Sequence, residues 1–131
     1  MVLFILKYLC YNKLTMSELN ILEENRPWGS FRRFTNNQKS TVKLIFVNPN
    51  EELSLQSHNK RSEFWRVIKG NGIFLVDDLK KDVMYGDEQE IPLGAKHRMI
   101  GGPDGMEVLE ISLGDFDEND IIRYEDKYNR I

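Results

Sequence analysis

Histidine occurs only twice in this chain of 131 residues, and each histidine lies near other side chains that can bind a metal. Gln56 and His58 are two positions apart, so on a β-strand they would face the same side. Glu63 begins the next apolar run and offers a carboxylate. Two imidazoles, a carboxylate and an amide oxygen suit zinc, manganese, iron, cobalt or nickel. The spacing therefore predicts one divalent-metal site with four ligands: Gln56, His58, Glu63 and His97.

A different interpretation of these histidines stays open at this point. A lone histidine is more often a surface residue, or a core residue with satisfied hydrogen bonds, than a metal ligand. The joint arrangement favours a site, because both histidines lie in strand-like segments bounded by turns. Glu63 enters the apolar stretch 64–68, and a carboxylate that is buried there needs a partner.

Short apolar runs separated by turn residues must position these side chains. Residues 41–47 are rich in β-branched and aromatic types, which are typical of strands. Glycines at 70 and 72 predict a tight hairpin between the strands expected at 63–69 and 73–76. Further strands are expected at 53–58, 83–85, 89–91, 97–100 and 106–113. The pattern predicts an all-β sandwich or barrel. Acidic residues before Ile121 and Ile122 predict a short helix within 117–128.

Length and composition fit one globular domain. Apolar residues make up 40% and charged residues 30%, with 18 basic against 21 acidic side chains, so nothing favours nucleic-acid or membrane binding. The single cysteine, Cys10, excludes an intramolecular disulfide and indicates a reducing, cytoplasmic location. We expect residues 1–23 to be an N-terminal extension, with Met16 as a possible natural start, and residues 24–131 to be the folded domain.

Several spaced motifs resemble one family. The pattern Gln-x-His-x-x-Arg-x-Glu spans residues 56–63, and Ile-Pro-x-Gly-x-x-His spans 91–97. Together with the entry motif at 26–30 and the closing signature at 120–130, these motifs are similar to the cupin domain of type II mannose-6-phosphate isomerases. The resemblance implies a small cupin (jelly-roll) barrel with the metal ligands already named, zinc first among the metals. The chain departs from the family at Phe64, where a histidine is usual, and at Ser112.

This resemblance also implies a function and roles for further residues. It implies a metal-dependent isomerase that interconverts mannose 6-phosphate and fructose 6-phosphate as a homodimer. The alternatives are a non-catalytic cupin that binds a sugar or sugar phosphate in a polysaccharide pathway, or another cupin enzyme. Lys96, Arg123 and Glu110 are the candidates for catalysis. The proton could be moved by Lys96, Glu110 or a metal-bound water. The candidates for phosphate binding are Arg61, Arg98 and Arg130, and Arg123 is a further candidate for that role.

Overall fold

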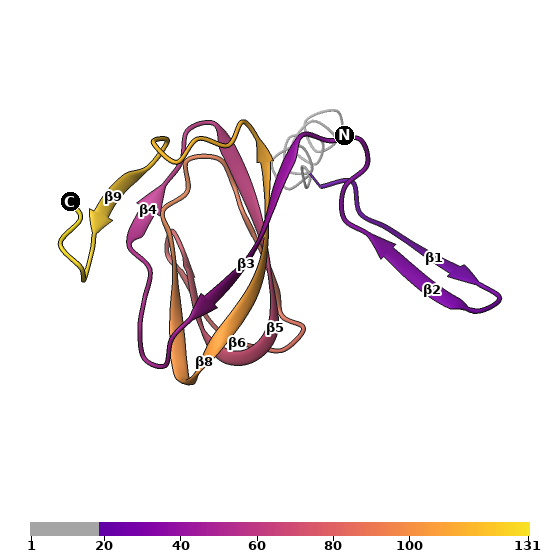
Figure 1. The fold of residues 1–131 in the computed structure, drawn as a ribbon, viewed down its shortest axis with the longest axis horizontal. Coiled ribbons are helices and arrows are strands. Elements are labelled where there is room, and N and C mark those ends of the chain that lie inside the picture. The colour runs from indigo at the N-terminus through magenta and orange to yellow at the C-terminus, as the bar shows by residue number, and fades with distance from the viewer. Residues whose placement is uncertain (1–18) are drawn as a thin grey trace, which may run out of the picture. The chain divides into compact units, whose positions relative to one another are not determined.

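The structure is a computed structural model that describes residues 19–131. The predicted extension up to residue 18, including Cys10 and Met16, lies outside the described residues. The chain divides after Asn36 into two compact units. The first contains an antiparallel hairpin of β1 (Leu22–Arg26) and β2 (Gly29–Arg33), which Figure 1 shows in indigo. The second unit, residues 37–131, contains the predicted site and is called the sheet unit below.

The sheet unit is one antiparallel sheet of seven strands. β3 pairs with β8, β7 pairs with β5, and the rest follow the order β6-β5-β8-β4-β9. Since β6 and β9 end this order, the sheet is not closed, and the predicted barrel is an open one. The strands are β3 (Ser40–Val47), β4 (Leu55–Ser57), β5 (Arg61–Val76), β6 (Leu79–Met84), β7 (Glu88–Ile91), β8 (His97–Gly114) and β9 (Ile122–Glu125).

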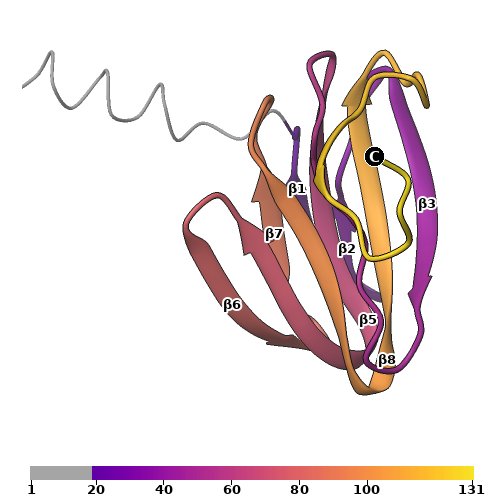
Figure 2. The same cartoon turned by 90° about the vertical axis from the view of Figure 1, so that its left-hand side faces the viewer.

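Two long strands, β5 and β8, fold this sheet back on itself. Glu63 pairs with Ser112 near one end of β5, and Val76 pairs with His97 at the other end. On a straight strand Glu63 and Val76 would lie about 40 Å apart. His97 nevertheless approaches Glu63 to 3.5 Å, so the paired strands must bend into two facing layers. Figures 1 and 2 show β5 and β8 side by side and turning at the same end of the unit.

The bend lies where the sequence predicted a hairpin at Gly70 and Gly72. That prediction is wrong, because β5 continues through both glycines and the next turn follows at Asp77 and Asp78. The register with β8 shifts between Gly70 and Gly72, as in a β-bulge. Gly70 has a φ of 77°, and a Cβ there would lie 2.2 Å from the Gly105 carbonyl oxygen. The glycines therefore permit a bend with close backbone contact rather than a strand reversal.

The core lies between the two layers. Inward side chains of the first half of β5, such as Trp65 and Val67, pack with Phe74 from its second half and with Met99 and Val108 from β8. The Trp65 and Phe74 rings meet edge to face with centroids 4.9 Å apart. This apolar core supports one end of the candidate site, because Trp65 also contacts the His97 ring at 5.5 Å.

The predicted C-terminal helix is wrong. Residues 19–131 contain no helix, and thus none that could span a membrane. Asp117 accepts a hydrogen bond from the Asn119 amide, which favours a local turn over a helix. Asp120 uses its carboxylate for the Asn59 and Lys60 amides, 2.9 Å from each. The following residues form β9, which pairs with β4.

Candidate metal centre

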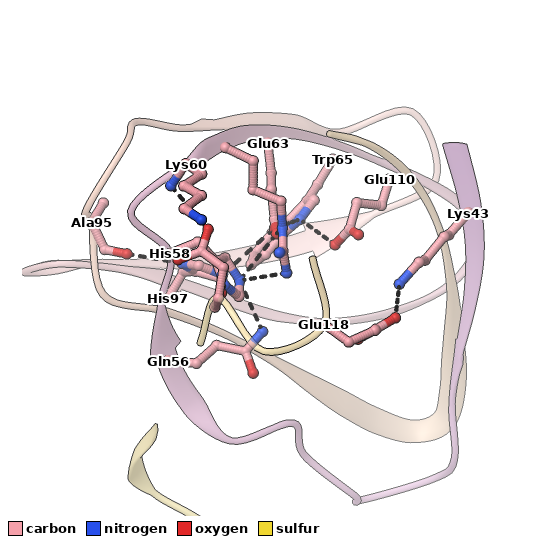
Figure 3. Close-up of polar contacts among 12 residues, drawn as sticks. Lys43, Gln56, His58, Lys60, Glu63, Trp65, Ala95, His97, Glu110 and Glu118 are labelled. Carbon is pink, nitrogen blue, oxygen red and sulfur yellow. Dashed lines mark hydrogen bonds and ion pairs between the residues drawn. The ribbon is translucent and has the colours of Figure 1, made fainter. Parts of the chain in front are cut away.

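Strand alternation places the acidic and histidine side chains on the inner face of the sheet unit. Glu63 and Trp65 are two apart on β5 and both face inward, whereas Phe64 between them faces the opposite side. His97 begins β8, and His58 precedes β5 in the turn after β4. Figure 3 shows both imidazoles turned toward the Glu63 carboxylate. All three side chains are buried.

The three side chains bring nitrogen and oxygen atoms to one point. His58 Nε2 lies 3.2 Å from Glu63 Oε1, and His97 Nε2 lies 3.5 Å from Glu63 Oε2. The three ligand atoms lie within 4.8 Å of one another. Two ligands about 2.0–2.1 Å from a tetrahedral zinc would lie about 3.3 Å apart. The spacing therefore fits a single divalent ion without large movement of the side chains.

Main-chain carbonyls set the tautomer of both histidines. His58 Nδ1 lies 2.6 Å from the Asp120 carbonyl oxygen, and His97 Nδ1 lies 2.9 Å from that of Ala95. Each Nδ1 must carry the donated proton when the ring is neutral, so each Nε2 presents a lone pair to the centre. The buried His97 Nε2 has no hydrogen-bond partner within residues 19–131, which is the condition expected of a metal ligand.

Electrostatics at the centre favour the forms that bind metal. Burial lowers the pKa of His97 by disfavouring the charged ring, although the Glu63 carboxylate opposes this effect. Burial would raise the pKa of Glu63, but a hydrogen bond from His58 and positive charge on either histidine, both present only while a ring holds its second proton, lower it to about 2. A neutral imidazole and an ionised carboxylate are the states that donate electron pairs to a cation.

A second buried carboxylate, Glu110, lies beside this set. Trp65 Nε1 donates to Glu63 Oε2 at 3.0 Å and to Glu110 Oε2 at 3.2 Å. Burial raises the pKa of Glu110 to about 8, and the neighbouring negative charge of Glu63 adds to the effect. The centre thus contains one carboxyl group that stays ionised and one that holds a proton near neutral pH.

Gln56, the predicted fourth ligand, reaches the edge of this cluster. Its Nε2 lies 3.4 Å from His58 Nε2, while its Oε1 accepts a hydrogen bond from the Ser54 hydroxyl at 2.7 Å. The oxygen would face the centre after rotation of the amide group, and the two ends of an amide are assigned from such contacts. Its β4 position pairs directly with His97 on β8.

The structure brings two of the predicted cations close to the centre. Arg61 is buried, and its Nη2 lies 3.2 Å from His58 Nε2. Arg123 on β9 pairs with Gln56, so Arg123, Gln56 and His97 form one row across three strands. The buried Nε of Arg123 has no hydrogen-bond partner in the described part of the chain.

Other predicted cations are engaged elsewhere. Arg98 contacts Glu125 through a 3.1 Å ion pair and donates to the Leu53 carbonyl. Arg130 donates two hydrogen bonds to the carboxylate of Asp126, four positions earlier. Lys96 is exposed, and its ammonium lies 4.2 Å from the Tyr124 ring centroid. None of these contacts joins the side chain to Glu63 or to either histidine.

The two departures from the family pattern lie on different faces. Phe64 pairs with Ile111 on the outer face of β5, so a histidine at this position would not point into the centre along with Glu63. Ser112 pairs with Glu63, and its buried hydroxyl has no partner among residues 19–131. Of the two departures, Ser112 is therefore the one that alters the inner face.

The sequence did not reveal several residues that lie around the candidate metal centre. Lys43 on β3 pairs with Glu110 on β8, and its ammonium lies 3.2 Å from the Glu118 carboxylate. The Phe116 ring makes cation–π contacts with Lys43 and with Arg61. The inner-face position of Lys43 follows from the β-strand alternation of residues 41–47, once the register with β8 is known. The carbonyls that orient the histidines belong to Ala95 and Asp120, and main-chain atoms give no signal in a sequence.

Comparison with solved structures defines the class of fold. The capsular polysaccharide assembling protein CapF of Staphylococcus aureus is similar over 87% of this chain and 35% of its own, with a TM-score of 0.61 and 20% identity. A cupin-2 domain protein of Rhodospirillum rubrum is similar over 80% of each chain, with a TM-score of 0.57 and 17% identity. The all-β fold is therefore cupin-like.

Sequence comparison identifies the family within that class. Residues 16–126 match the family described as mannose-6-phosphate isomerase C-terminal, and this chain belongs to that family. Mannose-1-phosphate guanylyltransferase 2 of Escherichia coli O157:H7 is 38% identical over 105 residues, which are 79% of this chain and 22% of the relative. Alginate biosynthesis protein AlgA of Pseudomonas aeruginosa is 35% identical over 113 residues, 85% of this chain and 24% of AlgA. The chain thus spans under a quarter of these relatives.

Proposed function

We propose that this chain is a metal-dependent aldose–ketose isomerase that interconverts mannose 6-phosphate and fructose 6-phosphate. The observation that carries the proposal is the convergence of His58, Glu63 and His97 in a domain of the mannose-6-phosphate isomerase family. Spacing and motifs in the sequence point to the same three residues. A divalent ion bound there, zinc first among the candidates, would polarise the sugar carbonyl as a Lewis acid.

The proton transfer between C1 and C2 requires a base beside the polarised carbonyl. Glu110 is the best-placed group, because it lies in the same buried cluster and shares the Trp65 indole N–H with Glu63. Its pKa, raised to about 8, makes the ionised form a stronger base than an ordinary carboxylate. Glu110 would take the proton from one carbon of the sugar and return it to the neighbouring carbon.

The phosphate of the substrate requires cations at the edge of the centre. Arg123 is the first candidate, because it lies in one row with Gln56 and His97 and its Nε has no partner in the described part of the chain. Arg98 and Arg130 are weaker candidates, since both are engaged by carboxylates. Lys96 is not retained as the base, because its exposed ammonium lies against Tyr124.

One experiment separates catalysis from simple sugar-phosphate binding. The purified chain is assayed for metal content and for conversion of mannose 6-phosphate in a coupled assay, with and without a chelator. We expect turnover that the chelator removes and added zinc, manganese or cobalt restores. Absence of turnover at every metal loading, with retained binding of mannose 6-phosphate, would instead establish the non-catalytic cupin. Glu110→Gln is the matched variant, in which metal binding persists and turnover falls at least about a hundredfold.

We also infer that the chain forms a homodimer through β3. This strand pairs only with β8 within residues 37–131, so its other edge keeps unpaired main-chain groups. Its outward side chains Val42, Leu44 and Phe46 are 59%, 54% and 66% exposed. A second copy of the same strand would pair with these main-chain groups and cover this apolar stripe.

The cytoplasm, which holds sugar phosphates, is the location that fits the proposed isomerase function.

A further inference from the structure

The Arg61 guanidinium contacts two of the three candidate ligand atoms. Its Nη2 lies 3.2 Å from His58 Nε2, and its Nε donates to Glu63 Oε1 at 3.4 Å. When the His58 ring is neutral, its Nδ1–H donates to the Asp120 carbonyl oxygen, and its Nε2 atom can then only accept. At His58 the guanidinium therefore uses the one electron pair that would bind a metal ion, and at Glu63 it occupies the side of an oxygen that would face the ion.

These two uses exclude each other. A lone pair that accepts a hydrogen bond from Arg61 cannot at the same time coordinate a cation, and two positive charges a few ångströms apart repel strongly in a buried site. We propose that Arg61 is an internal competitor of the metal, and that metal binding requires its guanidinium to withdraw from His58 and Glu63. The withdrawn guanidinium then becomes available to an anionic group of the substrate. This inference rests on the metal site of the proposed function.

The segment that follows β8 holds Arg61 in its competing position. Arg61 Nη1 donates to the Asp117 carbonyl oxygen at 3.1 Å, and its guanidinium carbon lies 4.3 Å from the Phe116 ring centroid. Asp120, in the same segment, accepts hydrogen bonds from the turn that precedes Arg61. Residues 115–120 therefore stabilise the guanidinium where it contacts the ligand atoms, and loosening this segment should favour the metal.

The test measures metal affinity rather than turnover. Zn²⁺ and Co²⁺ dissociation constants are determined by competition with a chromophoric chelator for the wild type, Arg61→Met and Arg66→Met. Methionine fills the space of arginine without hydrogen-bond donors. Arg66 lies on the outer face of the same strand and pairs with Glu88, so it controls for the lost charge. We expect Arg61→Met to bind metal at least about tenfold more tightly and Arg66→Met to stay within about twofold.

A second variant and a spectroscopic measurement test the proposal even if Arg61→Met folds poorly. Phe116→Leu changes only a half-buried side chain outside the strands and should tighten metal binding by a smaller factor. In the wild type labelled with ¹⁵N-arginine, the Arg61 Nε–H resonance should move when Zn²⁺ is added. An unchanged resonance, or unchanged or weaker affinity in both variants, would overturn the proposal.

The outcomes also separate this inference from the proposed function. If the wild type binds metal and shows chelator-sensitive turnover while Arg61→Met binds metal equally well, only the competition is wrong. If neither protein binds metal, the metal site itself is wrong and both proposals fall. Metal binding by Arg61→Met but not by the wild type would support the competition most directly.

Discussion

At the scale of single residues, Glu63 and Glu110 share one indole N–H and have opposite tendencies to bind a proton. Glu63 faces two histidines and forms an ion pair with the Arg61 guanidinium, so its negative charge is compensated. Glu110 faces Glu63, and burial without an equally close cation disfavours its ionised form. Two carboxyl groups this close cannot both be charged at low cost, so their surroundings assign them different states.

The raised pKa of Glu110 predicts how stability depends on pH. A carboxyl whose folded-state pKa is about 8, against an ordinary value of 4.5, binds its proton more tightly in the folded protein. Its stabilising contribution is complete below pH 4.5 and is lost as the pH rises through about 8. Urea unfolding of chelator-treated protein should show a decline over this range that Glu110→Gln reduces, by a few kcal/mol at most. Parallel curves for the two proteins would contradict the assignment.

Removal of one imidazole should abolish stoichiometric metal binding. In His97→Ala the centre loses the Nε2 atom that has no hydrogen-bond partner within residues 19–131. We expect the zinc affinity to fall at least about a hundredfold, more than the loss of a residue that only supports a ligand. Metal analysis after dialysis measures this change. Lys96→Ala, an exposed neighbour, serves as the control, and unchanged metal content in His97→Ala would remove His97 from the ligand set.

At the scale of elements, the sequence predicted strands well and connections poorly. The β-branched run at 41–47 and the apolar run that begins at Glu63 are both strands, because local composition determines them. The Gly70 region was predicted as a hairpin, since glycine permits both a turn and a bulge. The pairing partner decides between them, and residues distant in sequence, such as Met106 and Gly101, supply it. The helix predicted within 117–128 is wrong for the same reason, because β9 forms there by pairing with the distant strand β4.

The bend can be tested by comparing two glycines. Gly70 and Gly94 have φ values of 77° and 79°, so alanine is strained at both positions by about 1–2 kcal/mol. Only at Gly70 would the added Cβ collide with backbone, the Gly105 carbonyl oxygen, whereas nothing lies within 4 Å of a Cβ at Gly94. Urea denaturation should therefore show a larger loss of stability for Gly70→Ala than for Gly94→Ala. Equal losses would mean that close strand contact at the bend is unimportant.

At the scale of the whole molecule, the exposed stripe on β3 predicts the oligomeric state. Sedimentation of the wild type should show a dimer, and Leu44→Asp should shift it to monomer because a buried unpaired charge is costly. Leu79→Asp is the matched control, since Leu79 is 48% exposed against 54% for Leu44 and lies on β6. A wild type that sediments as a monomer at micromolar concentration would contradict the dimer.

The candidate site was more predictable than the path of the chain around it. Spacing and motifs selected Gln56, His58, Glu63 and His97 because ligand chemistry restricts residue types strongly. Arg61, by contrast, was predicted as a phosphate ligand, and its contact with His58 and Glu63 depends on a loop that sequence patterns did not resolve. The positions of Arg98 and Arg130 also depend on ion pairs that spacing alone does not reveal.

The main-chain origin of the two histidine hydrogen bonds has an evolutionary consequence. A point substitution can delete a supporting carboxylate, but it cannot delete a carbonyl. Substitution of the Asp120 or Ala95 side chain therefore leaves the hydrogen bonds that orient His58 and His97 in place, as long as the local backbone conformation is unchanged. Sequence drift in these supporting segments would leave the tautomers intact. Relatives can thus diverge around the histidines while the histidines themselves continue to face one another.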